Sequence, residues 1–204
     1  MNSFDEFLSG LELLDWQPAG HMDPGVLDLL ADLGRRPHLL WDFIGSWDEV
    51  NLETRQLRCH ETSTHYKWFV YYHEKLRYRI WLHQYKAAME RRNGYAEVPH
   101  NHRYSLASLV LNGQFEHHFF DVVAGDLIEI SERCEAYSRG DVYSVDWRSV
   151  HKLSGLSDHT VTLVVESPVA RHFSEAFYGS SGPPNLCLDF VALHGQLLDE
   201  IAFL

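Results

Sequence analysis

Cysteine and basic residues are scarce in this sequence. The 204 residues include three cysteines, Cys59, Cys134 and Cys187, which are too widely spaced for a disulfide framework or a C-x-x-C metal knuckle. We therefore expect buried free thiols, as in a reducing compartment. Lys and Arg total 17 against 29 Asp and Glu, and the longest basic cluster is Arg91-Arg92. A net charge of −12 without a basic run argues against a nucleic acid or an anionic membrane as partner.

Long apolar runs are also absent. No window approaches eighteen uninterrupted apolar residues, so no membrane span is predicted. The first ten residues, MNSFDEFLSG, have neither a basic region nor an apolar core, which predicts a cytoplasmic protein without a signal peptide. What the chain does contain is 45% hydrophobic and 13% aromatic residues, enough to fill the core of one compact domain.

The first fifty residues have helical patterns. One apolar patch consists of Leu8, Leu11, Leu13 and Leu14. Asp23-Pro24 then resembles an N-cap followed by Pro at the first helical position, and Gly34 ends the apolar repeat behind it. A third helix is predicted from His38 to about Glu49, and helical spacing returns over 189–204.

From residue 64 the character changes to short segments rich in aromatic and β-branched residues. These predicted strands, separated by Gly, Asn, Asp and Pro, are 67–72, 78–85, 105–111, 114–120 and 161–166. Short strands with no helices between them favour an antiparallel barrel or sandwich. We predict a mainly β protein in which a helical segment (1–63) flanks a barrel (64–178) that is followed by a loop and a helix (179–204).

His100 and His102 stand two residues apart within GYAEVPHNHRYSLASLVLNG. In a strand, such residues project from one face, and two neutral imidazoles there suit Fe, Zn, Ni or Cu. Two ligands do not complete a site, so a third must come from elsewhere. In a chain with 14 histidines, the pair alone is equally explained as polar loop content.

The surroundings of the pair are more specific. Gly94, five residues, His100-x-His102 and then Gly113 resemble the first motif of the cupin superfamily. Gly140-Asp141 and His151, eleven residues after the glycine, resemble its second motif, in which a Gly-Asp turn opens a strand and a metal-binding histidine follows. The stretch between them, 114–139, has room for two strands and a turn. The resemblance implies a double-stranded β-helix, or jelly-roll, barrel with a metal on His100, His102 and His151.

The sequence departs from the usual cupin motif at one ligand position, and this departure limits which cupins it resembles. Cupins usually carry a glutamate separated from the second histidine by three or four residues, where this chain has Leu106 and Ala107. A three-histidine Fe(II) site resembles that of the thiol dioxygenases, which act on cysteine or 3-mercaptopropionate. Three protein ligands leave open positions for substrate or O2. Zn, Ni and Mn are the alternative metals.

The same resemblance implies roles for other residues. The family's carboxylate-binding arginine falls nearest Lys67, with Arg79 next, and Tyr104 beside the motif joins them as a substrate-binding residue. Its Ser-His-Tyr relay falls on Thr162, Val164 and Glu166, and the cysteine of its crosslink on Leu106 or Ala107. These departures argue against cysteine itself as the substrate.

The alternation of side chains along a predicted strand assigns other polar residues to one face or the other. Along 116–118, Glu116 and His118 share one face and His117 the other, and we take His118 as a catalytic acid or base beside the metal. Thr162 and Glu166 are the other catalytic assignments. Scattered histidines are interpreted as ordinary satisfied or exposed side chains: His60, His65, His73 and His83.

The prediction is thus a non-haem iron oxygenase that acts with O2 on a small amino-acid-like or thiol-containing substrate. Histidine ligands leave the metal dicationic, which favours an anionic chelating substrate. Two alternatives remain: a redox-silent metal cupin catalysing isomerisation, elimination or tailoring, and a non-enzymatic cupin that binds a small ligand. The chain is expected to be a monomer or a homodimer.

Overall fold

The computed structural model describes residues 1–16, 20–91, 95–123, 126–177 and 185–187. Its helices and strands, in chain order, are α1 (Phe4–Glu12), α2 (Gly25–Gly34), α3 (His38–Gly45), α4 (Glu49–Gln56), β1 (His60–Glu61), β2 (His65–Tyr72), β3 (Arg79–Tyr85), the 3-10 helix η1 (Tyr95–Glu97), β4 (Leu106–Asn112), β5 (Gln114–Val123), β6 (Asp126–Ser138), β7 (Val142–Val145), β8 (Val150–Ser154), β9 (Val161–Glu166), β10 (Ser174–Ala176) and β11 (Asn185–Cys187).

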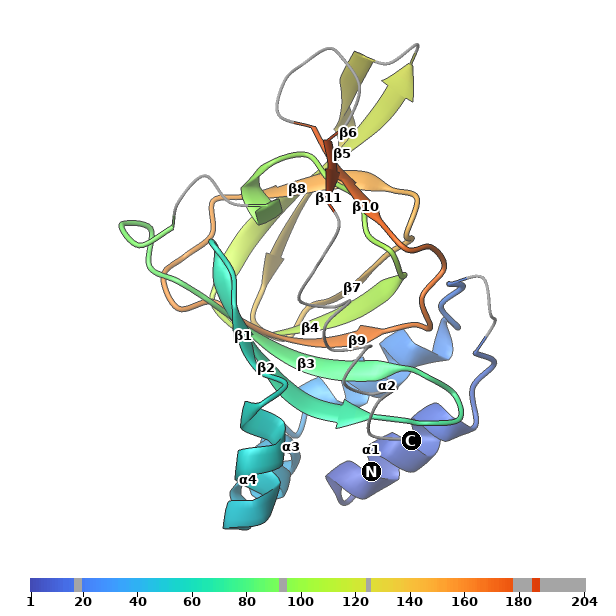
Figure 1. Cartoon of the computed structure of the whole chain (residues 1–204), viewed down its shortest axis with the longest axis vertical. Coiled ribbons are helices and arrows are strands. Elements are labelled where there is room, and N and C mark those ends of the chain that lie inside the picture. Colours follow the sequence, from blue (N-terminus) through green and yellow to red (C-terminus); the bar gives the residue numbers. More distant parts are fainter. Residues whose placement is uncertain (17–19, 92–94, 124–125, 178–184, 188–204) are drawn as a thin grey trace.

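The strands form a barrel of two main antiparallel sheets, with α1 to α4 below the larger one (Figure 1). The large sheet has the order β1-β2-β3-β9-β4-β7, the small sheet β6-β5-β8, and β10 pairs with β11. Consecutive strands pair from β1 to β3, whereas the β3–β9 and β4–β9 pairs join segments that are far apart in sequence. The predicted mainly β, jelly-roll fold is confirmed.

Alternation along the central strands produces two apolar clusters. On β9, Leu163 and Val165 face the helices, whereas Val164 faces the space between the sheets. The cluster under the large sheet includes Leu30 and Leu33 of α2. The cluster between the sheets includes Leu106, Val110, Phe115, Tyr143, Val145 and Leu153. Because β4 and β9 are covered on both faces, their sequences are almost continuously apolar.

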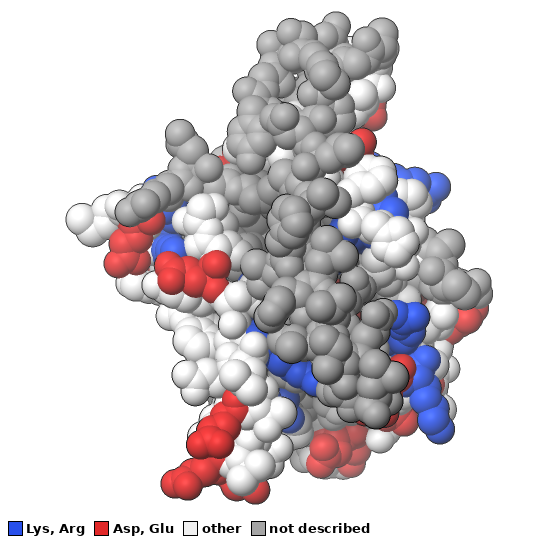
Figure 2. All heavy atoms as spheres, viewed as in Figure 1, with Lys and Arg blue, Asp and Glu red and all other residues white. Residues whose placement is uncertain are grey.

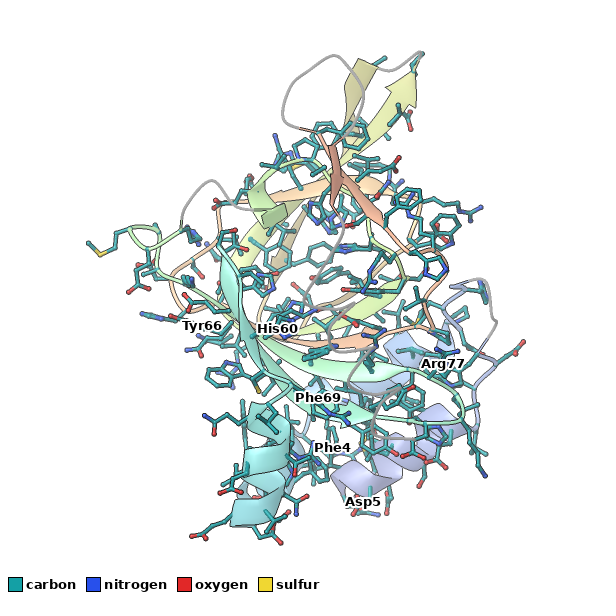
Figure 3. All side chains as sticks on the ribbon, viewed as in Figure 1. Phe4, Asp5, His60, Tyr66, Phe69 and Arg77 are labelled. Atoms are coloured by element: carbon teal, nitrogen blue, oxygen red, sulfur yellow. The ribbon has the colours of Figure 1, made fainter. Side chains whose placement is uncertain are left out.

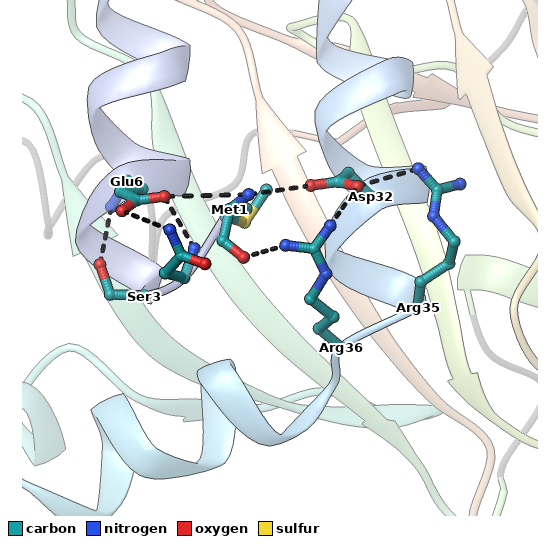
Figure 4. Close-up of polar contacts among 7 residues, drawn as sticks. Met1, Ser3, Glu6, Asp32, Arg35 and Arg36 are labelled. Atoms are coloured by element: carbon teal, nitrogen blue, oxygen red, sulfur yellow. Dashed lines mark hydrogen bonds and ion pairs between the residues drawn. The ribbon is translucent and has the colours of Figure 1, made fainter.

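The helices attach to the sheet by their apolar faces. In Figure 3, Phe4 of α1 points toward the large sheet and its neighbour Asp5 points away from it. Polar contacts through Met1 join α1 to α2: the Met1 amino group lies 3.8 Å from Glu6 of α1 and 3.8 Å from Asp32 of α2, and Arg36 donates to the Met1 carbonyl (Figure 4). Among the helices of the described residues, none is long and apolar enough to cross a membrane.

Most sequence predictions of local structure hold. The five predicted strands correspond to β2, β3, β4, β5 and β9, and the stretch 114–139 holds the two strands β5 and β6. Helix α2 begins at Gly25 with Pro24 in the N-cap position, one residue later than predicted, and the Oδ1 atom of Asp23 accepts from the Gly25 amide at 2.8 Å. The Gly140-Asp141 turn opens β7, with Gly140 at φ +96°.

Three predictions need correction or lie outside the description. The third helix ends at Gly45, because Asp48 caps a separate helix, α4, by accepting from the Asn51 amide at 2.8 Å. Cys134 is exposed instead of buried, because it lies on the outer face of β6, and Cys59 is half-buried. The helix predicted over 189–204 lies outside the described residues, and within 179–204 the described part is strand β11.

Candidate metal centre

His100 and His102 lie in the segment between η1 and β4. His100 does not belong to a regular strand, contrary to expectation, but forms isolated bridges with His151 of β8 and Ala176 of β10. Its amide donates to the His151 carbonyl, and its carbonyl accepts from the His151 amide, both at 2.8 Å. This reciprocal pair joins the two motif segments through the backbone, although His151 stands 49 positions after His102 in the sequence.

The three imidazoles converge. Ring centroids lie 4.9 Å apart for His100 and His102, 4.4 Å for His100 and His151, and 4.9 Å for His102 and His151. The Nε2 atoms of His102 and His151 are 2.9 Å apart. Two nitrogens bound at right angles to one transition metal stand about 3 Å apart. The potential ligand atoms of all three lie within 4.8 Å of one another, and in the described part of the chain no carboxylate joins them.

The protonation of these rings suits metal binding. Burial lowers the pKa of His100 to about 4, although its bond to the Val98 carbonyl acts in the opposite direction. Burial also lowers the pKa of His102 and of His151 well below the ordinary value. His100 Nδ1 donates to the Val98 carbonyl at 2.8 Å, so its neutral ring keeps the Nε2 lone pair free. All three rings are therefore neutral at physiological pH.

His117 is a neighbour of the cluster that sequence reasoning did not select. It is fully buried, and its Nε2 atom lies 2.6 Å from Nδ1 of His151. Burial lowers its pKa to about 3, so it is a neutral hydrogen-bond partner. His118 lies on the opposite face of β5 and contacts Ser154 Oγ at 2.7 Å. The placement of His118 beside the metal was wrong, since alternation assigned His117 and His118 to different faces without telling which face is inside.

Glu166 lies in a second polar group on the inner face of the large sheet. It is 1% exposed, and its Oε1 and Oε2 atoms lie 3.1 Å from Lys67 Nζ and 3.9 Å from Arg79 Nε. Burial raises its pKa, but Lys67 and Arg79 outweigh that effect, so the net pKa is lowered and Glu166 is ionised. The Tyr104 hydroxyl donates to Glu166, and the Tyr104 ring stacks on His102 with centroids 5.6 Å apart. Tyr104 thus connects this group to the histidine cluster.

Thr162 is fully buried on the same face, two residues from Val164 of the apolar cluster. Thr162 lies opposite His83 of β3, and His83 in turn lies opposite Lys67 of β2. Among the described residues of β3 and β9, three buried polar atoms on this face have no hydrogen-bond partner: Trp81 Nε1, His83 Nε2 and Thr162 Oγ1. His65 packs on His83 with centroids 4.5 Å apart. These histidines, dismissed from spacing alone, line the interior because β2 and β3 pair in this register.

No family model and no curated protein matches the sequence. Solved structures with a similar fold include KdgF from Halomonas sp., at 14% identity and TM-score 0.40, over 54% of this chain and 84% of that one. Ectoine synthase from P. lautus has 14% identity and TM-score 0.37, over 55% and 70%. The oxalate decarboxylase formate complex from Lactobacillus farciminis has 16% identity and TM-score 0.42, over 61% and 34%. The fold assignment rests on the strand pairing of this chain itself.

Proposed function

We propose that the protein is a cupin-type metalloenzyme in which His100, His102 and His151 hold one Fe(II) ion. The observation that carries the proposal is the convergence of three neutral imidazoles, with two Nε2 atoms at metal-ligand separation. A bound Fe(II) ion with open coordination positions would supply O2 activation and a binding point for a chelating substrate. His117 would fix the orientation of the His151 ring through Nδ1.

The charges of the interior support an anionic substrate. Lys67 and Arg79 are two cations around the single carboxylate of Glu166, and the histidines nearby are neutral. The surplus positive charge, together with that of the metal, favours a carboxylate or thiolate. We therefore propose a small amino-acid-like or thiol-containing acid, bound by Lys67, Arg79 and Tyr104.

Polar atoms along β3 and β9 support a substrate with more than one polar group. Trp81 Nε1 is a donor, whereas His83 Nε2 and Thr162 Oγ1 can donate or accept, and all three are buried without partners in the described part of the chain. Glu166 is held by Lys67, Arg79 and Tyr104, so it fixes the cations instead of transferring protons freely. Burial raises the pKa of Tyr104 well above 10, which leaves a neutral hydroxyl whose proton goes to Glu166 and whose oxygen can accept a hydrogen bond.

A redox-silent metal site is the second proposal. The positions of the thiol dioxygenase relay carry Thr162, Val164 and Glu166, and Val164 packs in the apolar cluster. A Zn, Ni or Mn ion on the same histidines would act as a Lewis acid for isomerisation or elimination. The residues that bind the substrate would be the same in both proposals.

Metal analysis of protein purified without oxygen tests the site, and O2 consumption with thiols and amino acids tests the chemistry. We expect His151→Ala to lose the metal of the histidine cluster, while the matched control His172→Gln, at an exposed histidine, retains it. A normal metal load in a folded His151→Ala protein would contradict the site. Bound zinc, with no O2 uptake after loading with Fe(II), would favour the redox-silent proposal.

A further inference from the structure

A second group of metal-ligating side chains lies on the outer face of the small sheet. It consists of Glu116 and His118 of β5 and Cys134 of β6, which we call the outer cluster. His118 and Cys134 are direct partners in the β5–β6 ladder, and Glu116 is two residues before His118 on the same face. The outer cluster therefore follows from strand register, with no loop involved.

Distances within the outer cluster are close to those around a single ion. Cys134 Sγ lies 3.8 Å from His118 Nε2, and His118 Nε2 lies 3.6 Å from Glu116 Oε2. The three potential ligand atoms all lie within 4.8 Å of one another. A sulfur and a nitrogen bound tetrahedrally to zinc stand about 3.5 Å apart, so rotamer adjustments of a few tenths of an ångström suffice.

Ser154 of β8 holds two of these side chains in place. Its hydroxyl donates to Glu116 Oε2 at 3.1 Å and lies 2.7 Å from His118 Nε2. Because the hydroxyl proton goes to the carboxylate, Ser154 Oγ accepts the Nε2 proton of His118. That proton is the one a metal ion would displace, and Ser154 would continue to orient Glu116.

The donor set selects the ion. A thiolate, an imidazole and a carboxylate are the ligand types of zinc, and the two anionic groups neutralise a divalent cation. Lys152 opposes His118 on β8, but its ammonium lies over the Phe120 ring, 5.3 Å from the centroid. We propose that Glu116, His118 and Cys134 form a Zn²⁺ site with three protein ligands and one open position, separate from the histidine cluster inside the barrel.

Cobalt titration of reduced, metal-free protein tests the outer cluster specifically, because only a thiolate ligand gives an intense thiolate-to-Co²⁺ charge-transfer absorption. We expect this absorption to saturate by two added equivalents of Co²⁺, because the histidine cluster can take up one of them, and to disappear on adding excess Zn²⁺. It should be abolished in Cys134→Ser and in His118→Gln. The matched controls Cys59→Ser and His172→Gln should retain it.

Absence of the band in wild-type protein, or its persistence in Cys134→Ser, would overturn the proposal. Circular dichroism of each variant checks folding, and both ligand positions are on a solvent-facing surface. A second measurement is the alkylation rate of Cys134, followed by peptide mass spectrometry, which Zn²⁺ should slow at least tenfold; an unchanged rate would also overturn the proposal. The interior histidines supply no thiolate, so the outcome is independent of the proposed Fe(II) site.

Discussion

Glu166 shows how one residue can set the electrostatics of the barrel interior. Its carboxylate is buried beside Lys67 and Arg79, and each of the three would be costly to bury alone. Its pKa is lowered despite burial, so the ionised form is the one that the fold stabilises. A carboxylate with a lowered folded-state pKa contributes stability above its unfolded pKa and loses that contribution as pH falls through the folded value.

Glu166→Gln should therefore lower the free energy of unfolding at pH 7 by about 3–5 kcal/mol, because it leaves two buried cations without their counter-charge. The difference from wild type should shrink as pH falls below 4.5, the ordinary pKa of a glutamate, because the unfolded-state carboxyl binds its proton first. It should be lost once pH has fallen below the lowered pKa of the folded state. Urea unfolding at a series of pH values measures both effects. Glu61→Gln is the control, because the Glu61 side chain is 61% exposed and its pair with Lys86 should contribute at most about 1 kcal/mol. Equal stability of Glu166→Gln and wild type at pH 7 would contradict the ionised assignment.

For single residues, the sequence predicts that the three histidines converge, because their spacings match two motifs that each contain glycine at a turn. It does not predict His117, because alternation gives relative faces and leaves the choice of the inner face to packing against Phe115 and Tyr143. The group around Glu166 depends on which residues stand opposite one another in β2, β3 and β9, information that is not local in sequence.

Among the elements, the connection from β4 to β5 depends on Gly113. This residue has φ +84°, and a Cβ atom there would lie 2.3 Å from Thr160 Oγ1 and 2.7 Å from Ser157 Oγ. Gly140, which opens β7, also has a left-handed conformation, at φ +96°, but a Cβ there would meet nothing within 4 Å. A substitution at Gly140 therefore tests backbone strain alone, whereas a substitution at Gly113 adds steric overlap to the same strain.

Gly113→Ala should lower the stability by more than the roughly 1–3 kcal/mol that a left-handed alanine alone costs, and Gly140→Ala by an amount within that range. Gly45→Ala, at the open end of α3, should be neutral or stabilising by up to about 1 kcal/mol. Chemical denaturation of the three variants gives the order. If Gly113→Ala and Gly140→Ala cost the same, overlap with Thr160 plays no part.

The elements also show the limit of pattern reading. Strands such as β9 were predictable, because aromatic and β-branched residues between turn residues have few other structures available. Helix α4 was not, because it buries none of its residues and so lacks an apolar repeat. Figure 2 shows acidic side chains gathered over α4, whereas basic ones lie in separate small groups on the described surface.

In the molecule as a whole, the two apolar clusters exist independently of the histidine cluster. One lies between the helices and the large sheet, and the other between the sheets. Both bury continuous apolar surface, which is the main favourable contribution to folding. The barrel is therefore expected to fold without a metal.

Chelator-treated protein should keep its β circular dichroism spectrum and unfold cooperatively. Adding the metal of the histidine cluster at about 100 times its Kd should add about 2.7 kcal/mol, and raise Tm by about 5–10 °C. His151→Ala should not respond, because it lacks a ligand. Differential scanning calorimetry measures all three, and loss of the cooperative transition on chelation would show that metal binding and folding are coupled.

The reciprocal backbone bonds between His100 and His151 have a consequence for ion selection. They hold two ligand-bearing segments together whether or not an ion is present, so little reorganisation accompanies uptake or release. A rigid set of three nitrogens follows the general order of divalent affinities, in which Cu²⁺ and Zn²⁺ bind more tightly than Fe²⁺. Occupancy would then follow the supply of exchangeable ions around the protein, and growth medium and purification buffer would set which ion is recovered with it.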